Sequence, residues 1–429
     1  MPTMRGTINL TQYPMMPHRY PDGTLLRKGD LHANPLNALY FLLQEGVVKL
    51  PKEDFDQFVT CYQKFSTTAE DNLTDKERCE TILEMASIIQ KIEKSDSDVR
   101  VLFAGDIICD RCENDYPMLC LLRKLGELGV KRTFIDGNHD SKFIELFYRH
   151  MIDYDPEPPD HIPTKDLNSK NENKRHHAQY RSFYNFLNLA AYIEENNIDH
   201  PDIIQETQDI LNQHYLPNLK VIDINLRQTP DKISVEISTH AATRFESIKT
   251  LAEALNVEYH EENRAALLET CEQINAAMRD KLWPFINATE RIKDNYWINT
   301  DALLQVRGPE RAPKRHPLYD FMFVRHDNHQ LKENPERNHK DENFVFFHGH
   351  DKSSYYKNSL GLDDSPVGKI NDPRYYQGLY YVHSSHDPIL TPVQSPVLMS
   401  SPQATSSTKN TNLESSNEPS SHSSPYTHK

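Results

Sequence analysis

Short apolar segments that end on acidic, amide or imidazole side chains are the feature that most constrains the fold of this chain. The clearest of them reads VLFAGD, in which an apolar run leads through Gly105 to Asp106. Four more apolar segments end in the same way, on Asp30 and His32, on Asn138 and His139, on His240, and on His350. A buried strand that ends on carboxylates needs a metal, a basic ligand or solvent to compensate their charge.

Helical segments separate these apolar runs. Asn34 can cap a helix that has Pro35 at its first position, and Gly129 is well placed to end a later one. Residues 51–94 are charged and amphipathic, which is typical of helices. Strands that alternate with helices indicate an α/β fold with a parallel or mixed sheet and helices on its faces. Because ligands bind at the carboxyl ends of strands in such sheets, side chains that are distant in sequence can meet at one edge.

The later part of the chain has a different composition. Residues from about 150 to 230 are polar and lack glycine, which predicts a helical insertion, and a further helical block is expected over about 245–285. The segment KISVEISTH alternates apolar and polar residues, which predicts a strand that ends at His240. We therefore expect one domain over residues 1–387. The Ser/Pro-rich tail over 388–429 is too poor in apolar residues to fold and is expected to be disordered.

Composition excludes several classes of protein. The formal net charge of −15 argues against a general nucleic-acid-binding surface. No apolar run reaches about 18 residues, so no membrane span is expected, and the N-terminal segment lacks the apolar core of a secretory signal. The six cysteines are expected to be reduced thiols in a cytoplasmic setting. Cys109 and Cys112 form a C-x-x-C pair, for which incidental thiols are favoured over a redox or zinc site because no second pair accompanies it.

The residue types at the strand ends favour divalent metal ions. Mixed carboxylate, amide and imidazole donors suit two hard or borderline ions better than a structural zinc, which prefers thiolates. Two ions about 3.5–4 Å apart can polarise a phosphoryl group and generate hydroxide from a bridging water. Mn²⁺ is the expected ion, with Fe and Zn as alternatives.

The order of the motifs carries a family resemblance. Gly-Asp-x-His, Gly-Asp-x-x-x-Asp-Arg, Gly-Asn-His-Asp, a histidine and Gly-His follow one another, as in the calcineurin-like metallophosphoesterases, and the pair Asp110-Arg111 resembles their phosphoprotein phosphatase branch. Ala33 replaces the usual glycine, GDIICDRC has one extra residue, and GNHD replaces GNHE. The extra residue, the Asn114-Asp115-Tyr116 sequel and the helical insertion are similar to secreted effector phosphatases of Legionella-type bacteria. The resemblance implies a mixed β-sheet sandwich flanked by helices.

The resemblance also implies roles for individual residues. One ion would be held by Asp30, His32 and Asp106, and Asp106 would bridge to a second ion held also by Asn138, His240 and His350. His139 would be the general acid on the leaving oxygen, oriented by Asp110. Arg111 and Arg325 would bind the phosphate oxygens, with Asn138 beside them.

Some of these assignments have alternatives. His348 competes with His350, but strand alternation points the two to opposite faces, and the glycine before His350 favours it. Arg325 can equally be a solvated arginine at the end of a strand.

The sequence therefore predicts a metal-dependent phosphomonoesterase. The resemblance makes a phosphoprotein the expected substrate, on serine, threonine or tyrosine, with no nucleic-acid partner and no membrane span. The expected location is the cytoplasm, or a host cell reached without a cleaved signal peptide. A nucleotide or dinucleoside polyphosphate hydrolase and a catalytically silent binding module are the alternatives, and the oligomeric state stays open.

Overall fold

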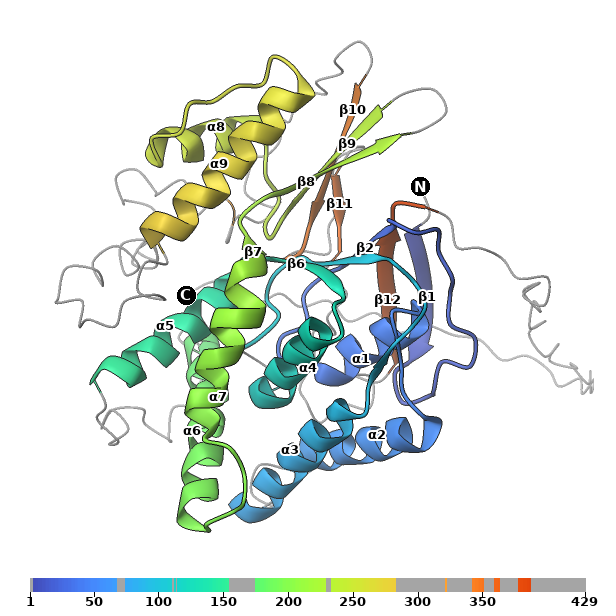
Figure 1. Ribbon diagram of the computed structural model, residues 1–429, viewed down its shortest axis with the longest axis vertical. Coiled ribbons are helices and arrows are strands. Elements are labelled where there is room, and N and C mark those ends of the chain that lie inside the picture. Colours follow the sequence, from blue (N-terminus) through green and yellow to red (C-terminus); the bar gives the residue numbers. More distant parts are fainter. Residues whose placement is uncertain are drawn as a thin grey trace, which may run out of the picture. The chain divides into compact units, whose positions relative to one another are not determined.

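The computed structural model describes residues 3–67, 74–109, 112, 114–153, 174–228, 233–282, 321, 342–350, 359–362 and 377–386. All of them belong to one unit, Met1–Ile389. They form a mixed α/β fold with two main sheets and helices (Figure 1). The predicted tail over 388–429 lies outside the described residues.

The larger sheet combines parallel and antiparallel strands. Its order is β1 (Thr3–Asn9), β12 (Gln377–Ser384), β2 (Leu25–Lys28), β5 (Arg100–Phe103), β6 (Lys131–Ile135) and β7 (Leu219–Lys220). β2, β5, β6 and β7 run parallel to one another, whereas β12 is antiparallel to both β1 and β2. The two ends of the described chain therefore pair with each other beside the parallel strands.

The smaller sheet is built from later parts of the chain. Its order is β11 (Ser359–Gly361), β10 (Glu342–His348), β9 (Ile233–Thr239) and β8 (Asp223–Gln228). β9, β10 and β11 are parallel, and β8 is an antiparallel edge strand. A separate two-stranded ribbon joins β3 (Val48–Lys49) to β4 (Glu93–Lys94).

The helices follow the predicted segments in most places. They are α1 (Pro35–Gln44), α2 (Lys52–Thr67), α3 (Asp75–Gln90), α4 (Asp115–Glu127), α5 (Asn138–Asp153), α6 (Lys174–Glu195), α7 (Ile203–Ile210), α8 (Phe245–Ala254) and α9 (Arg264–Leu282). The predicted cap of α1 is present, since the Asn34 side chain accepts the N–H of Asn37 at 2.9 Å. Gly129 has a φ of 65° just after α4, as a helix-ending glycine should. Among the described helices, none has both the length and the apolar content to cross a bilayer.

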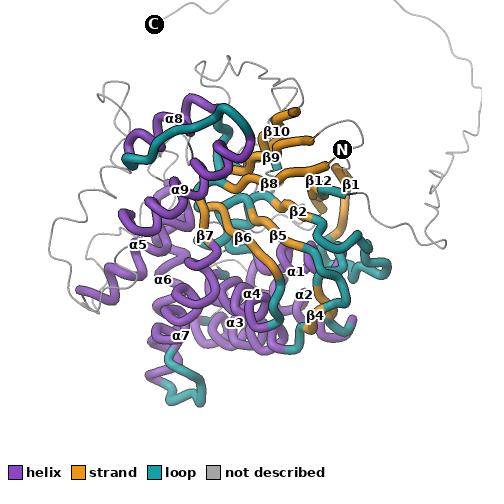
Figure 2. The backbone as a smooth tube through the Cα atoms, turned by 45° about the horizontal axis from the view of Figure 1, so that its top comes forward, coloured by secondary structure: helices purple, strands orange, loops and turns teal. Residues whose placement is uncertain are grey.

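The two sheets pack face to face, and helices cover their outer faces. Phe103 of β5 meets Phe41 of α1, with ring centroids 6.0 Å apart, on one side of the larger sheet. Phe346 of β10 meets Phe245 of α8 at 5.5 Å, on the outer side of the smaller sheet. The layers are thus α1 to α4, the larger sheet, the smaller sheet, and α8 with α9 (Figure 2). Because successive strand residues face opposite ways, the remaining alternate residues lie between the sheets.

The predicted end of the helical insertion was wrong. α6 and α7 lie within 150–230, and a π-helical turn (Leu211–Tyr215) and a 3-10 turn (Leu216–Asn218) continue them. β7 and β8 then occupy residues that were predicted to be helical. β8 looks polar because it is an edge strand in which only its first residue, Asp223, is fully buried, so its composition carries no strand signal.

Candidate active site

The predicted strand ends meet at one place, and they come from both sheets. Asp30 and His32 follow β2, Asp106 follows β5, and Asn138 and His139 begin α5 directly after β6, so the larger sheet supplies five of these side chains. The smaller sheet supplies the other two, His240 after β9 and His350 after β10. The carboxyl ends of parallel strands therefore form the site, as the fold class predicts.

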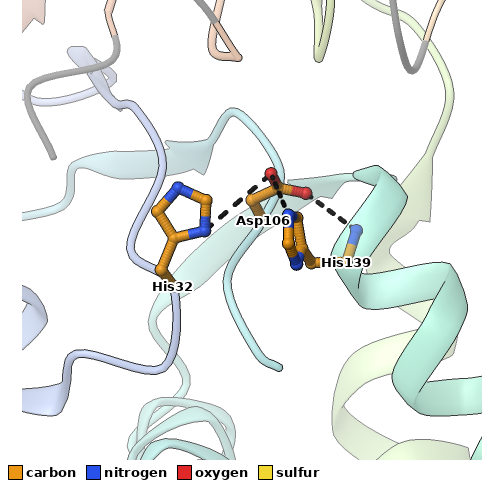
Figure 3. A group of neighbouring side chains, drawn as sticks. All are labelled: His32, Asp106 and His139. Atoms are coloured by element: carbon orange, nitrogen blue, oxygen red, sulfur yellow. Dashed lines mark hydrogen bonds and ion pairs between the residues drawn. The ribbon is translucent and has the colours of Figure 1, made fainter. Parts of the chain in front are cut away.

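Asp106 is the centre of this group. Its Oδ2 lies 3.9 Å from His32 Nδ1 and 3.7 Å from His139 Nε2 (Figure 3). Its Oδ1 lies 3.3 Å from His240 Nε2. The backbone N–H of His139 donates to Asp106 Oδ1 at 2.9 Å. Asp106 itself is 1% exposed, so its charge is compensated by these neighbours and not by solvent.

Two sets of side chains have the spacing of metal ligands. The first group is His32, Asp106 and His139, and the second group is Asp106, His240 and His350. Within each group, one possible ligand atom from each residue lies within 4.8 Å of the others. Asp106 belongs to both groups, which is the arrangement expected of a carboxylate that bridges two ions.

The orientation of His240 supports a cation at the second group. Its Nδ1–H donates to the carbonyl oxygen of Ala104 at 2.9 Å, which leaves the Nε2 lone pair facing Asp106. Nε2 also lies 3.2 Å from Asn138 Oδ1. In that tautomer the lone pairs of His240 Nε2, Asn138 Oδ1 and Asp106 Oδ1 face one another, so a proton or a metal ion must lie among them. This mixed set of oxygen and nitrogen donors fits a divalent ion.

The electrostatics of the site agree with this reading. Burial lowers the pKa of His240, but Asp106, Asp30 and the carbonyl oxygen of Ala104 together outweigh burial and raise that pKa to about 10. Burial works against the charge of Asp106, yet His139, His240 and His32 hold its pKa well below the usual range. The site therefore attracts positive charge, and a metal ion that binds would take the place of the proton on the imidazole.

Asp30 and His350 connect the two sheets at the site. The backbone N–H of His350 donates to both carboxylate oxygens of Asp30, at 2.9 and 3.0 Å. Asp30 Oδ2 lies 3.7 Å from His32 Nε2, and Asp30 Oδ1 lies 4.0 Å from His240 Nδ1. Asp30 thus stands beside both groups. His348 lies apart from them, with its Nδ1 at 2.9 Å from the carbonyl oxygen of Gly349.

Three glycines allow the strand ends to approach so closely. A Cβ on Gly105 would lie 2.4 Å from His240 Nδ1, one on Gly137 would lie 2.2 Å from the Asp106 nitrogen, and one on Gly349 would lie 2.1 Å from Asp30 Oδ1. Real Cβ atoms do not approach other atoms this closely, so each position requires glycine. Each glycine directly precedes a residue of the site or of its Gly-Asn-His-Asp motif.

The backbone of the site is strained as well. His32, Asp106 and His350 have φ values of 49°, 49° and 56°, in the left-handed region that non-glycine residues rarely adopt. Such conformations persist only where the surrounding contacts hold them, and they cluster at functional sites. Ala33, which stands where the related motif has glycine, has a φ of 55°, so this segment keeps the glycine-like conformation without the glycine.

One important residue of the site was missed by sequence reasoning. Asp140 is fully buried, and its Oδ1 accepts the N–H groups of Ile107 and Ile108 at 2.8 and 2.9 Å. Its Oδ2 accepts the N–H of Gly137 at 3.2 Å. Burial, with the nearby Asp106 charge, raises the pKa of Asp140 to about 8. The sequence feature that could have indicated Asp140 is its place as the last residue of Gly-Asn-His-Asp, from which a short acidic side chain reaches the neighbouring loop.

Three predicted site residues lie outside the described residues. They are Asp110, Arg111 and Arg325. The loop before the first two is anchored, since Asp115 Oδ1 accepts the N–H of Cys109 at 2.6 Å. Cys109 and Cys112 are both buried.

Comparison with known proteins places the chain in a family. The WipA-like phosphatase domain family matches residues 99–369, which include Asp106, Asn138, His139, His240 and His350. The crystal structure of the phosphatase domain from the Legionella effector WipB is similar, with a TM-score of 0.53 and 22% identity over 77% of this chain and 100% of that one.

A cold-active protein-tyrosine phosphatase of a psychrophilic Shewanella species aligns with a TM-score of only 0.29 and 12% identity, over 82% of this chain and 74% of that one. A comparison with curated proteins finds no match. The family match covers more than half of the 429 residues and includes most of the site, and on this basis the chain belongs to the WipA-like phosphatase domain family.

Proposed function

We propose that this phosphatase is a metal-dependent phosphomonoesterase of the calcineurin-like type. The observation that carries the proposal is that Asp106 is shared by two groups of metal-type ligands at the carboxyl ends of the strands. His32 and Asp106 of the first group would hold one ion together with Asp30, whose Oδ2 lies 3.7 Å from His32 Nε2, and His139 would not be a ligand. Asp106, Asn138, His240 and His350 would hold the other. Two divalent ions bound there would supply Lewis-acid polarisation of the phosphoryl group and a water of lowered pKa.

The chain's own side chains would divide the remaining work. His139 is the half-buried member of the first group, with Nε2 at 3.7 Å from Asp106 Oδ2, so it can reach a substrate and donate a proton to the leaving oxygen. Asp110 would orient that imidazole. Arg111 and Arg325 would bind the phosphate oxygens in a bidentate manner.

The preferred substrate would be a phosphoprotein. This part of the proposal is supported by membership of a phosphatase-domain family and by the fold shared with a phosphatase domain from a bacterial effector. By the same likeness, the protein would act as an effector on proteins of a host cell. The preferred ion would be Mn²⁺, since carboxylate, amide and imidazole donors together suit it.

Replacement of Asp106 by asparagine tests the metal assignment. Asn keeps the oxygen that accepts the His139 N–H but removes the charge that would bridge the ions. We expect Asp106→Asn to remain folded, to lose both Mn²⁺ ions by elemental analysis, and to lose hydrolysis of phosphopeptides. Asp96→Asn is the matched control, because that side chain is fully exposed and pairs only with Lys49 in the described contacts. A variant that still holds two ions would remove Asp106 from the bridge.

A panel of phosphopeptides and nucleotides, assayed with the wild-type protein and Mn²⁺, tests the substrate class. Hydrolysis of phosphopeptides well above that of nucleotides is expected. Preference for nucleotides would contradict the phosphoprotein assignment while leaving the metal site in place.

A further inference from the structure

The two ligand groups differ in how they depend on the fold. His32, Asp106 and His139 all follow strands of the larger sheet, so the first group is set within one sheet. In the second group, Asp106 comes from the larger sheet, whereas His240 and His350 come from the smaller one. The geometry of the second group therefore depends on how the two sheets are placed against each other.

A small apolar cluster accounts for part of the contact between the sheets. It consists of Leu25, Leu102, Ala104 and Ile135 from the larger sheet with Val345, Phe347 and Leu362 from the smaller sheet and its flank. Apolar contact favours burial but is not directional, so it does not by itself fix the register of one sheet on the other.

Beside this cluster lies a buried ionic contact that is directional. Arg27 of β2 donates from Nη2 to Glu236 Oε2 of β9 at 2.8 Å and from Nε to Ser238 Oγ of the same strand at 3.0 Å. The side chains of Arg27 and Glu236 are both 0% exposed. We call Arg27, Glu236 and Ser238 the inter-sheet clamp.

Neighbouring side chains hold both halves of the inter-sheet clamp. Arg27 Nη1 lies 3.1 Å from His383 Nδ1 of β12, and the guanidinium lies 4.2 Å from the centre of the Phe347 ring. On the other side, Glu236 Oε1 pairs with Arg227 Nε at 2.9 Å, and Oε2 accepts from Asn225 at 2.9 Å. Neither Arg27 nor Glu236 can therefore shift without breaking several contacts.

Stability alone does not explain this arrangement. Burying an ion pair costs desolvation, and well-packed apolar residues of similar volume are often at least as stabilising. What a planar guanidinium adds is a fixed geometry toward its acceptors, which apolar groups lack. The two clamped strands lead directly into the site, β2 to Asp30 and β9 to His240, whose facing atoms are 4.0 Å apart.

From this geometry we propose that the inter-sheet clamp positions His240 and His350 against Asp106, and so sets the affinity of the second group for its metal ion. Arg27, Glu236 and Ser238 are positioning residues and contact no ligand of either group in the described contacts. The proposal rests on the proposed two-ion site. It makes the two ions unequal, because the larger sheet supplies every proposed ligand of one ion, whereas the smaller sheet supplies His240 and His350 to the other.

The test measures the two Mn²⁺ dissociation constants separately by titration of the metal-free protein. In Arg27→Met/Glu236→Leu both charges are replaced together, so that neither is left buried without its partner. We expect one Mn²⁺ constant to weaken by about 10–100-fold, the usual range for loss of a group that supports a metal ligand, and the other to stay unchanged. Arg27→Lys, which keeps the charge but not the fork, should show a smaller weakening of the same constant.

Two comparisons identify the affected ion. In a His350→Ala background, which lacks a ligand of the second group, the double replacement should leave the remaining constant unchanged. The control is Arg123→Met/Glu206→Leu, which removes a partly exposed ion pair that joins α4 to α7 and so lies away from the sheet contact. It should lower the melting temperature while both constants stay as in the wild type.

Several results would overturn the proposal. Equal weakening of both constants would mean a general loss of stability, and no change in either would mean that the inter-sheet clamp does not act on the site. A wild-type protein that binds fewer than two ions would remove the clamp proposal and the proposed function together. A wild-type protein that binds two ions but hydrolyses no phosphomonoester would contradict the proposed function alone.

Discussion

Replacement of Gly349 by alanine should damage the site although it replaces none of the proposed ligands. The new Cβ would lie 2.1 Å from Asp30 Oδ1 and 2.8 Å from the carbonyl oxygen of Ala104. The backbone at Gly349 is not in the left-handed region, so the cost comes from lack of space and not from conformational strain. Asp30 would have to move, and the bonds that it accepts from His350 N–H would be lost.

The magnitude can be built from these two effects. Forcing one methyl group into a closely packed site costs about 1–3 kcal/mol. Losing a hydrogen bond to a charged group costs roughly 1.5–3 kcal/mol. We therefore expect Gly349→Ala to lower the free energy of unfolding by about 3–5 kcal/mol and to weaken Mn²⁺ binding. Gly129→Ala is the matched control, because it has open space around the new Cβ and a φ of 65°, so only about 1 kcal/mol of strain is expected.

Chemical denaturation of both variants, with and without Mn²⁺, measures the difference. If Gly349→Ala were no less stable than Gly129→Ala and bound Mn²⁺ normally, the close approach of Gly349 to Asp30 would not matter to the site, and glycine would not be required there.

Three further predictions concern single side chains. His139→Asn should reduce kcat on phosphoserine peptides by about 10²–10⁴-fold but less on an activated aryl phosphate, whose leaving group needs less protonation; equal losses in steady-state assays would remove the general-acid role. Asp140→Asn should lower Mn²⁺ affinity by about 10–100-fold in a metal titration, because the amide keeps one acceptor oxygen and cannot accept three backbone N–H groups; unchanged affinity would contradict its anchoring role. Burial, together with Arg27, lowers the pKa of His383 to about 2. Below the ordinary histidine pKa of about 6.5, His383 therefore takes up a proton when the protein unfolds, and the free energy of unfolding falls as the pH falls below about 6.5. Between pH 7 and about 5.5 the wild type should lose about 1 kcal/mol more than His383→Gln in chemical denaturation, and equal losses would mean that His383 is protonated in the fold.

Local patterns made part of the fold predictable. The apolar segments that pointed to the site contain β2, β5, β6, β9 and β10. They could be recognised because a buried strand needs a run of apolar residues, which is visible in the sequence. β1 and β12 were not predicted, since they pair with each other from opposite ends of the described chain, and no local pattern reveals such a pairing. β8 was missed for the related reason that an edge strand needs little apolar surface.

The site was predicted unevenly. Seven of its side chains could be selected because each follows an apolar run, but whether they bind metal ions stays a prediction. Asp140 and the inter-sheet clamp could not be found in this way. Arg27 lies within TLLRKGD, where an arginine in a strand is normally assigned to a solvated face, and nothing local reveals that Glu236 covers it.

By itself the sequence determined which side chains stand at the ends of which strands, because strand alternation, helix caps and glycine placement act over a few residues. The tertiary structure alone decided which of those ends meet, how far apart their atoms lie, and that the ligand groups share Asp106. Asp30 and the His350 N–H that it accepts are separated by 320 residues, and the packing of one sheet on the other brings them together. That packing depends on contacts between residues that are far apart along the chain, which no local pattern encodes.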